Sequence, residues 1–383
     1  MASPPDIVHI LYSGVGGEAG VVFPLAQAAA GSSRQHAIFF GIEPAAEANI
    51  RQCQALGIQW HGVQKQQGLD HAAQKEIIRL LLTIRPVGVI VHTLGTLPAC
   101  LKARKHLPNL KIIAVEHHSN TLKNVKRWLL SLFALWRADR VVYLTEKYRE
   151  QVAAKLRWFF KARVRRTVVI SNSLNLSLYT VARPASDNPF VFGMQGRMVD
   201  GKDFPTLLRA LASANEHNPH PLHLELVGDG PRRAELEELA KSLNVENHVT
   251  FCGMLSSRDL ISRMGQWHAY VHASMGETMS IAIMEAKACG LAIIATEAPG
   301  VSEFFQHGEN GLLVPQGDFK QVAQSLLKLQ SSHDLRLSLG CRARAEAEAC
   351  YASSHAWQSY FQLIEAKPTT PSITLNAVHQ VPV

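Results

Sequence analysis

Short runs rich in isoleucine and valine alternate with helix-forming stretches along most of the chain, and this alternation limits the possible folds more than any other feature. The runs lie at 7–12, 37–40, 87–92, 111–115, 140–144 and 168–170, and again at 190–193, 223–227, 248–251, 269–272, 292–295 and 311–314. Continuous apolar runs are typical of parallel strands covered by helices on both faces. Because the pattern occurs twice, it predicts an α/β protein with two doubly wound, Rossmann-like domains facing each other across a cleft.

The boundary between the two domains is predicted at the stretch 182–189, which is rich in proline and polar residues. We expect a first domain over 1–182 and a second over 183–351. A helix at 352–366 is expected to pack back on the first domain, and 367–383 to form a loose tail. In open α/β sheets, ligands bind beyond the carboxyl ends of the strands, so functional residues should directly follow strands.

The positive charge of the chain is concentrated in one block. The formal net charge is +8, but residues 123–166 contain 13 basic and 3 acidic side chains, a net of +10, so the remainder nets −2. A near-neutral protein with one basic block is not typical of a nucleic-acid-binding protein. Six scattered cysteines without a C-x-x-C pair predict reduced thiols, and we expect no signal peptide and no membrane-spanning segment. These features favour a cytoplasmic location.

A glycine-rich turn, Gly14 to Gly20, follows the first predicted strand. Glycines allow close backbone approach, and the helix that follows offers free N–H groups to an anion. The sequence also fits the G-x-G-x-x-A pattern of dinucleotide-binding folds. A tight turn without any ligand is the third interpretation.

A second loop, residues 196–202, carries Arg197 and Lys202 after the strand at 190–193. A guanidinium fork and an ammonium point charge on one loop are suited to a diphosphate. Two solvated surface cations are the simpler alternative.

The segment 272–290 gives the strongest signal. Thr278 or Ser280 is suited to cap a helix that ends at Gly290, which places Glu277 in the loop and Glu285 on the helix. The helix is otherwise apolar and is expected to be buried, and a buried carboxylate needs hydrogen-bond donors. Ribose or sugar hydroxyls would supply them. The alternative is a surface ion pair, between Glu285 and Lys287 or between Glu277 and a cation.

Taken together, these motifs resemble glycosyltransferase family 4. The resemblance rests on the two glutamates 277 and 285, the 196–202 loop, the turn 228–231, and the stretches 251–253 and 310–315. It covers residues 7–366 and implies the GT-B fold and a retaining, nucleotide-sugar-dependent transferase. The sequence departs from the family at 277–280, which reads Glu-Thr-Met-Ser where Glu-Gly-Phe-Gly is usual.

The resemblance also implies roles for individual residues. Arg197 and Lys202 would neutralise the donor diphosphate, Glu285 would bind the ribose, and Leu255 would lie against the base. The remaining roles are backbone contacts to phosphate from Gly16 and Gly17, contacts to the sugar and phosphate from Glu277, Met279 and Ser280, and a histidine facing the sugar, which is His117 or its neighbour His118. With these cations present no metal and no cofactor is expected, and UDP is favoured over GDP as the nucleotide.

The basic block contains two stretches that mix cations with apolar side chains. In 122–137 the residues Val125, Trp128, Leu129, Leu132 and Trp136 recur on one helical face. Basic amphipathic stretches with aromatic residues are typical of surfaces that bind anionic lipid, although solvated cations beside a packed apolar face would give the same pattern. The predicted membrane surface comprises Lys123, Lys126, Arg127, Lys155, Arg157, Trp158, Phe159, Phe160, Lys161, Arg163, Arg165 and Arg166.

These observations predict transfer of a hexose or N-acetylhexosamine from a nucleotide-diphosphate sugar to a growing, lipid-linked glycan of the lipopolysaccharide, capsule or exopolysaccharide type. The protein would act peripherally at the inner face of the cytoplasmic membrane. Two alternatives stay open. One is an NAD-dependent oxidoreductase, which requires an acidic residue at the end of the second strand to hold a ribose; Glu43 lies near that spacing but is expected in a loop. The other is a non-catalytic, membrane-associated GT-B-like binding protein.

Overall fold

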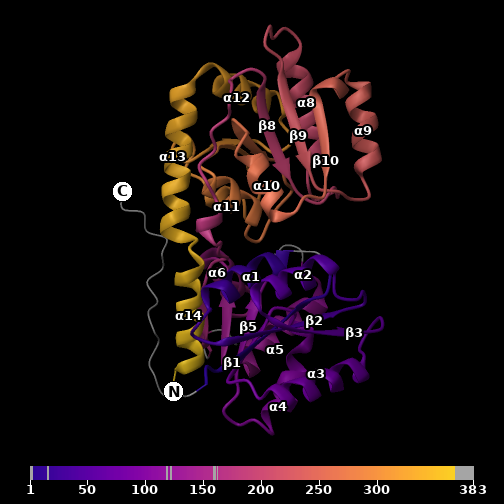
Figure 1. Ribbon diagram of the computed structural model, residues 1–383, viewed down its shortest axis with the longest axis vertical. Coiled ribbons are helices and arrows are strands. Elements are labelled where there is room, and N and C mark those ends of the chain that lie inside the picture. The colour runs from indigo at the N-terminus through magenta and orange to yellow at the C-terminus, as the bar shows by residue number, and fades with distance from the viewer. Residues whose placement is uncertain are drawn as a thin grey trace. The chain divides into compact units, whose positions relative to one another are not determined.

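The computed structural model describes residues 3–14, 17–117, 120, 123–157, 161 and 163–366. The chain divides into two compact units, a first unit of Met1–Asn175 with Cys350–Val383 and a second unit of Leu176–Ala349. Both are parallel sheets covered by helices (Figure 1). The prediction of an α/β protein with two Rossmann-like domains is confirmed.

The first unit is built on a sheet of order β3-β2-β1-β4-β5-β6-β7. Its strands are β1 (Asp6–Tyr12), β2 (Arg34–Gly41), β3 (Gln59–Gln64), β4 (Gly88–Val91), β5 (Lys111–Glu116), β6 (Arg140–Tyr143) and β7 (Thr167–Val169). The central strands are apolar and fully buried, as both-face coverage requires. Strand β3 was not predicted, because this edge strand is polar and half-exposed and lacks an apolar run.

Seven α-helices cover this sheet among the described residues: α1 (Gly17–Ala28), α2 (Glu47–Leu56), α3 (His71–Ile84), α4 (Leu97–Arg104), α5 (Val125–Arg137), α6 (Glu146–Lys155) and α14 (Ser353–Glu365). Side-chain caps set several of their starts: Asp70 accepts from two N–H groups of α3, and Asn124 accepts from the N–H of Arg127 in α5. Helix α14 returns from the far end of the chain, and its Trp357 indole donates to Ser32 at 3.2 Å.

The second unit is a sheet of order β10-β9-β8-β11-β12-β13. The strands are β8 (Phe190–Gln195), β9 (Leu222–Val227), β10 (Val249–Gly253), β11 (Ala269–His272), β12 (Ala292–Thr296) and β13 (Leu312–Val314). The order reverses between β8 and β11, which is the topological switch point where ligands of such sheets bind. Its helices are α8 (Phe204–Asn215), α9 (Arg233–Ser242), α10 (Ser257–Met264), α11 (Ile281–Ala288), α12 (Phe319–Ser331) and α13 (His333–Cys350).

Helix α11 begins and ends close to the predicted positions. Ser280 occupies the N-cap, although its hydroxyl makes no capping hydrogen bond. Gly290 adopts the left-handed conformation, with φ of +64°, beyond the last turn. The segment therefore places Glu277 in the loop before the helix and Glu285 on it.

Candidate functional site

The candidate site of the second unit forms where the loops after β8 and β11 meet at the switch point. The backbones of these loops pair with each other: the N–H of Asp203 donates to the carbonyl of Ala273 at 3.1 Å, and the N–H of Met275 donates to that of Gly201 at 3.1 Å. This pairing brings Lys202 opposite Ser274. Two segments far apart in the sequence are thereby fixed as one binding surface.

The loop carrying Arg197 is supported by the glycine turn after β9. The N–H of Met198 donates to the carbonyl of Asp229 at 2.9 Å. Gly228 has φ of +126°, and a Cβ there would lie 2.1 Å from the carbonyl oxygen of Gly196, so only glycine fits. Arg197 itself is exposed, and no side-chain hydrogen bond or ion pair joins it to another residue within the described ranges.

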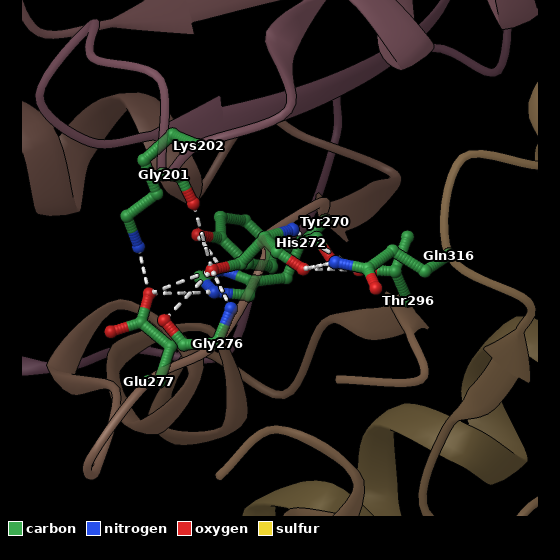
Figure 2. A network of polar contacts seen from close by, with 9 residues as sticks. Gly201, Lys202, Tyr270, His272, Gly276, Glu277, Thr296 and Gln316 are labelled. Carbon is green, nitrogen blue, oxygen red and sulfur yellow. Dashed lines mark hydrogen bonds and ion pairs between the residues drawn. The ribbon is translucent and has the colours of Figure 1, made fainter. Parts of the chain in front are cut away.

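Lys202, Glu277 and His272 form the polar centre of the site (Figure 2). The Lys202 ammonium contacts Oε1 of Glu277, and Nε2 of the fully buried His272 lies 3.2 Å from the same oxygen. Burial by itself raises the pKa of Glu277, but the hydrogen bond from His272 and the charge of Lys202 outweigh it and lower this pKa to about 2. Burial lowers the pKa of His272. Glu277 is therefore a permanent carboxylate. It pairs with a cation, as the alternative interpretation held, but the pair is half-buried and not on the surface.

The loop that carries Glu277 is held from the neighbouring strands. The N–H of Ser274 donates to the hydroxyl of Thr296 at 3.0 Å, and the amide of Gln316 donates to the carbonyl of Ser274 at 3.2 Å (Figure 2). The N–H of Glu277 donates to the carbonyl of Pro299 at 2.9 Å. The adjacent Gly300, with φ of +78°, leaves no room for a Cβ beside the carbonyl of Glu277.

Glu285 is hydrogen-bonded within the protein. The hydroxyl of Tyr179 donates to its Oε1 at 2.8 Å, and the amide of Gln195 donates to its Oε2. This half-buried carboxylate thus already has two donors from the protein, whereas ribose or sugar hydroxyls were expected to supply them. A carboxylate offers about four lone-pair sites, so further donors can still bind. Burial raises the pKa of Glu285.

The alternative pairing of Glu285 with Lys287 does not occur. The ammonium of Lys287 is fully buried, lies 2.6 Å from Glu346 and donates to the carbonyl of Phe304 at 2.5 Å. Sequence reasoning missed Gln195 and Tyr179 as partners of Glu285. Gln195 ends β8 at the switch point and was therefore open to prediction, whereas nothing in the sequence around Tyr179 indicates its role.

The other residues predicted in the second unit lie around this centre. Met279 and Ser280 are buried directly before α11, where the free N–H groups of the first turn lie. Leu255 is half-buried in the loop after β10. Their predicted contacts with phosphate and base stay predictions.

The residues predicted in the first unit lie at the carboxyl ends of its strands. His117 directly follows β5, and Gly17 begins α1. Gly16 and His118 lie outside the described residues. Strand β2 ends at Gly41 rather than at an acidic residue, and Glu43 lies beyond the strand in a loop, so among the described residues no acid stands at this strand end, where a dinucleotide-binding fold would hold the ribose.

The basic surface of the first unit contains both exposed and buried members. Helix α5 exposes Val125, Leu129 and Trp136 on one face, with 77%, 61% and 53% of their surfaces accessible. The cations Lys126, Arg127, Lys155, Arg157, Lys161 and Arg165 are exposed, whereas Arg163 and Arg166 are half-buried.

Two parts of the predicted membrane surface differ from this description. Lys123 is buried and lies 2.8 Å from the equally buried Glu116, so the surface cations do not include it. Trp158, Phe159 and Phe160 lie outside the described residues. Over the described ranges, no helix is long and apolar enough to span a bilayer, and no cluster of three or more His, Cys, Asp or Glu side chains is placed to bind a metal ion.

Fold and site define a protein of the GT-B class, with two Rossmann-like units and a cation–carboxylate centre at a switch point. Residues 181–346, within the second unit, match the family described as "Glycosyl transferases group 1". The predicted glycosyltransferase resemblance is confirmed at this level, while the assignment to family 4 stays a prediction.

Curated relatives and solved structures show the same resemblance. The chain is 31% identical over 183 residues to the lipopolysaccharide core biosynthesis glycosyltransferase LpsE of Rhizobium meliloti, covering 48% of this chain and 52% of LpsE. It is 31% identical over 137 residues to N-acetyl-alpha-D-glucosaminyl L-malate synthase of Bacillus anthracis, covering 36% and 35%. The chain thus spans about half or less of the length of these two relatives. The structure of Anabaena HepE in complex with UDP is similar at a TM-score of 0.76 and 21% identity, over 93% of this chain and 98% of HepE, and shows the same fold.

Proposed function

We propose that this protein is a retaining glycosyltransferase that moves a hexose or N-acetylhexosamine from a UDP-sugar to a growing, lipid-linked glycan. The observation that carries the proposal is the pairing of Lys202 with Glu277 at the switch point, beside the exposed Arg197. A cation fork, an ammonium and a permanent carboxylate at one strand end are suited to a diphosphate joined to a polyhydroxylated sugar.

The candidate site residues of the second unit each have a role in this proposal. Arg197 and Lys202 bind the diphosphate, and the first-turn N–H groups next to Met279 and Ser280 add donors to its oxygens. Glu285 accepts the ribose hydroxyls on the lone pairs that Tyr179 and Gln195 leave available. Leu255 packs on the base.

Glu277 accepts hydroxyl groups of the transferred sugar. With a pKa of about 2 it stays ionised and has no proton to donate, so it does not act as a general acid. Its permanent charge also sets the orientation of Lys202 before the donor binds. For the first unit, we propose that His117, or its neighbour His118, binds a hydroxyl of the sugar and that the backbone N–H groups of Gly16 and Gly17 bind phosphate.

The reaction breaks the bond between the anomeric carbon and the diphosphate oxygen and forms a bond from that carbon to an acceptor hydroxyl oxygen. The acceptor proton passes to the departing phosphate oxygen on the same face of the sugar, which retains the configuration. Negative charge develops on the leaving UDP, and the preoriented Arg197 and Lys202 stabilise it without a metal ion. We propose no cofactor beyond the nucleotide-sugar.

The acceptor is proposed to be presented at an anionic membrane. Val125, Leu129 and Trp136 form an exposed apolar face on α5, and exposed cations flank it. Apolar side chains that enter the headgroup region, with cations beside them, match an anionic lipid surface. Each lysine or arginine near such a surface contributes roughly 1 kcal/mol, which suffices for reversible peripheral binding at the inner face of the membrane.

Known relatives support the nucleotide and the acceptor class. LpsE is named for lipopolysaccharide core biosynthesis, and HepE has been solved with UDP and with UDP-glucose. The oxidoreductase alternative has little support, because Gly41 occupies the end of β2. The non-catalytic alternative is decided by the experiment.

Calorimetric titration of the full chain with UDP, GDP and ADP, without metal, tests the donor assignment. We expect UDP to bind at least tenfold more tightly than GDP or ADP, and Arg197→Ala to weaken UDP binding by roughly tenfold or more. Equal or absent binding of all three nucleotides would contradict the proposal. UDP binding without turnover of any UDP-sugar in the presence of glycan acceptors would favour the non-catalytic protein.

A further inference from the structure

Three histidines from neighbouring strands form one continuous stack in the first unit. His9 lies in β1, His92 directly after β4 and His117 directly after β5, and these strands are adjacent in the sheet. Nδ1 of His9 lies 3.1 Å from Nε2 of His92, and Nδ1 of His92 lies 2.8 Å from Nε2 of His117. The ring centroids are 5.4 and 5.1 Å apart. The stack leads from the sheet interior to the strand end that carries His117.

The inner end of the stack is closed by an amide. Nε2 of His9 lies 3.0 Å from the carbonyl oxygen of the Gln35 side chain, and the Gln35 amide nitrogen donates to the hydroxyl of Ser33 at 2.7 Å. The Gln35 oxygen accepts only, so Nε2 of His9 must carry the hydrogen. This contact sets the direction in which hydrogen bonds are donated along the stack.

Both inner histidines are neutral near pH 7. His9 and His92 are almost completely buried. Burial lowers the pKa of His9 to about 4 and that of His92 well below its ordinary value. Each ring therefore carries a single hydrogen, and a hydrogen on one nitrogen leaves the other as an acceptor.

The tautomer of each ring then follows from the hydrogen bond that its neighbour makes. Because Nε2 of His9 donates to Gln35, Nδ1 of His9 accepts, and the hydrogen between the first two rings belongs to Nε2 of His92. Nδ1 of His92 then accepts, so the hydrogen in the outer contact belongs to Nε2 of His117. One buried amide thus determines the tautomer of a histidine two rings away.

We propose that His9 and His92 are positioning residues that hold His117 with its hydrogen on Nε2, so that Nδ1 is the nitrogen that accepts a hydrogen bond or takes up a proton. The functional part of this inference rests on the proposed function, in which His117 binds a hydroxyl of the sugar. A neutral His117 in this tautomer accepts from that hydroxyl through Nδ1. In the opposite tautomer Nδ1 would carry a hydrogen and could only donate to it.

The tautomer is measured directly by nitrogen NMR on the full chain labelled with ¹⁵N-histidine. The His117 signals are identified by their loss in His117→Gln, and the control His36→Gln, which changes a buried histidine paired with Asp6 outside the stack, leaves them in place. A protonated Nε2 and a bare Nδ1 in the neutral ring support the inference. A hydrogen on Nδ1, or a mixture of both tautomers, overturns it whether or not the protein transfers sugar.

Two variants of His92 test the positioning role in catalysis. His92→Phe keeps a flat ring but removes both hydrogen bonds, and we expect kcat to fall at least tenfold, equivalent to about 1.4 kcal/mol, while UDP affinity stays unchanged. His92→Gln carries one donor and one acceptor, and should keep kcat within about threefold and retain the His117 tautomer. Full activity of His92→Phe would overturn the positioning role. Absence of transfer by the unaltered protein would instead refute the proposed function, and the NMR result would stand on its own.

Discussion

The ammonium of Lys202 lies against Oε1 of Glu277, joining two loops that are 75 residues apart in the sequence. His272 reaches the same oxygen from the end of β11. This arrangement means that Lys202 is already oriented, and partly neutralised, before any ligand arrives. A diphosphate must therefore share Lys202 with Glu277, and Arg197, which is exposed on the neighbouring turn, carries the larger part of the free charge.

Arg197→Ala is expected to weaken UDP binding by roughly tenfold or more, because hydrogen bonds to charged groups are worth about 1.5–3 kcal/mol. Arg197→Lys keeps the charge without the fork and should bind with intermediate affinity. Calorimetric titration with UDP measures the effect. The matched control is Arg209→Ala, an exposed arginine on α8, which should bind UDP as the unaltered protein does. Equal losses in both variants would mean that Arg197 acts only through overall charge.

Tyr179→Phe is expected to lower the free energy of unfolding by about 1–3 kcal/mol, since it removes one donor from the buried carboxylate of Glu285. Urea denaturation measures the change. The double variant Tyr179→Phe/Glu285→Gln should lose less than the sum of the two single changes, because the two side chains interact directly. Strict additivity would show that the hydrogen bond does not contribute.

Stability is expected to fall as the pH drops below 6.5, because His9 and His92, among other histidines, are buried in neutral form. The pKa of His9 lies at about 4 in the folded protein against 6.5 ordinarily, so between these values the unfolded chain binds more protons and acid favours unfolding. On going from pH 7.5 to pH 5, His9 lowers the free energy of unfolding by about 2 kcal/mol. Above pH 6.5 the full stability is retained. Denaturation curves at the two pH values measure it. His9→Gln should flatten the dependence, whereas the exposed His217→Gln should leave it unchanged.

Leu129→Ser with Trp136→Ser should release the protein from vesicles containing anionic lipid, because these side chains form the exposed apolar face of α5. Replacing Lys155, Arg157 and Lys161 by alanine should weaken binding as well and make the remainder less sensitive to salt. Vesicle flotation measures both. Leu337→Ser, which alters an exposed apolar residue of the second unit, is the control. Binding unchanged in both altered proteins would contradict the membrane proposal.

The fold was predictable because both sheets are parallel and buried, so most strands appear as uninterrupted apolar runs. Strand β3 escaped prediction for the opposite reason: at the edge of its sheet it is largely polar, and its only buried side chain is Val63. A strand covered on both faces can be predicted from its own residues, because it appears as an apolar run. A strand at the open edge of a sheet lacks that run.

The candidate site was predictable where function depends on residue type after a strand, and not where it depends on tertiary contacts. Arg197, Lys202 and Glu277 lie in the loops after β8 and β11, and Glu285 lies on the helix that follows, so their spacing is visible in the sequence. The partners that set their chemistry are distant in sequence: Tyr179 lies 106 residues from Glu285. The burial of Lys123 is equally invisible, because it follows from Glu116 across a loop.

The most direct test of the account compares the unaltered protein with Glu277→Gln, using a panel of UDP-glucose, UDP-galactose and UDP-N-acetylglucosamine with glycan acceptors. UDP release gives turnover, and calorimetry gives UDP affinity. The account predicts that Glu277→Gln lowers turnover by about 100-fold, the scale of lost transition-state electrostatics, while UDP binds as tightly or more tightly, because Lys202 is freed from its anionic partner. Glu309→Gln, an exposed glutamate, should match the unaltered protein. Full turnover by Glu277→Gln would contradict the central claim that the Lys202–Glu277 pair is the centre of the donor site.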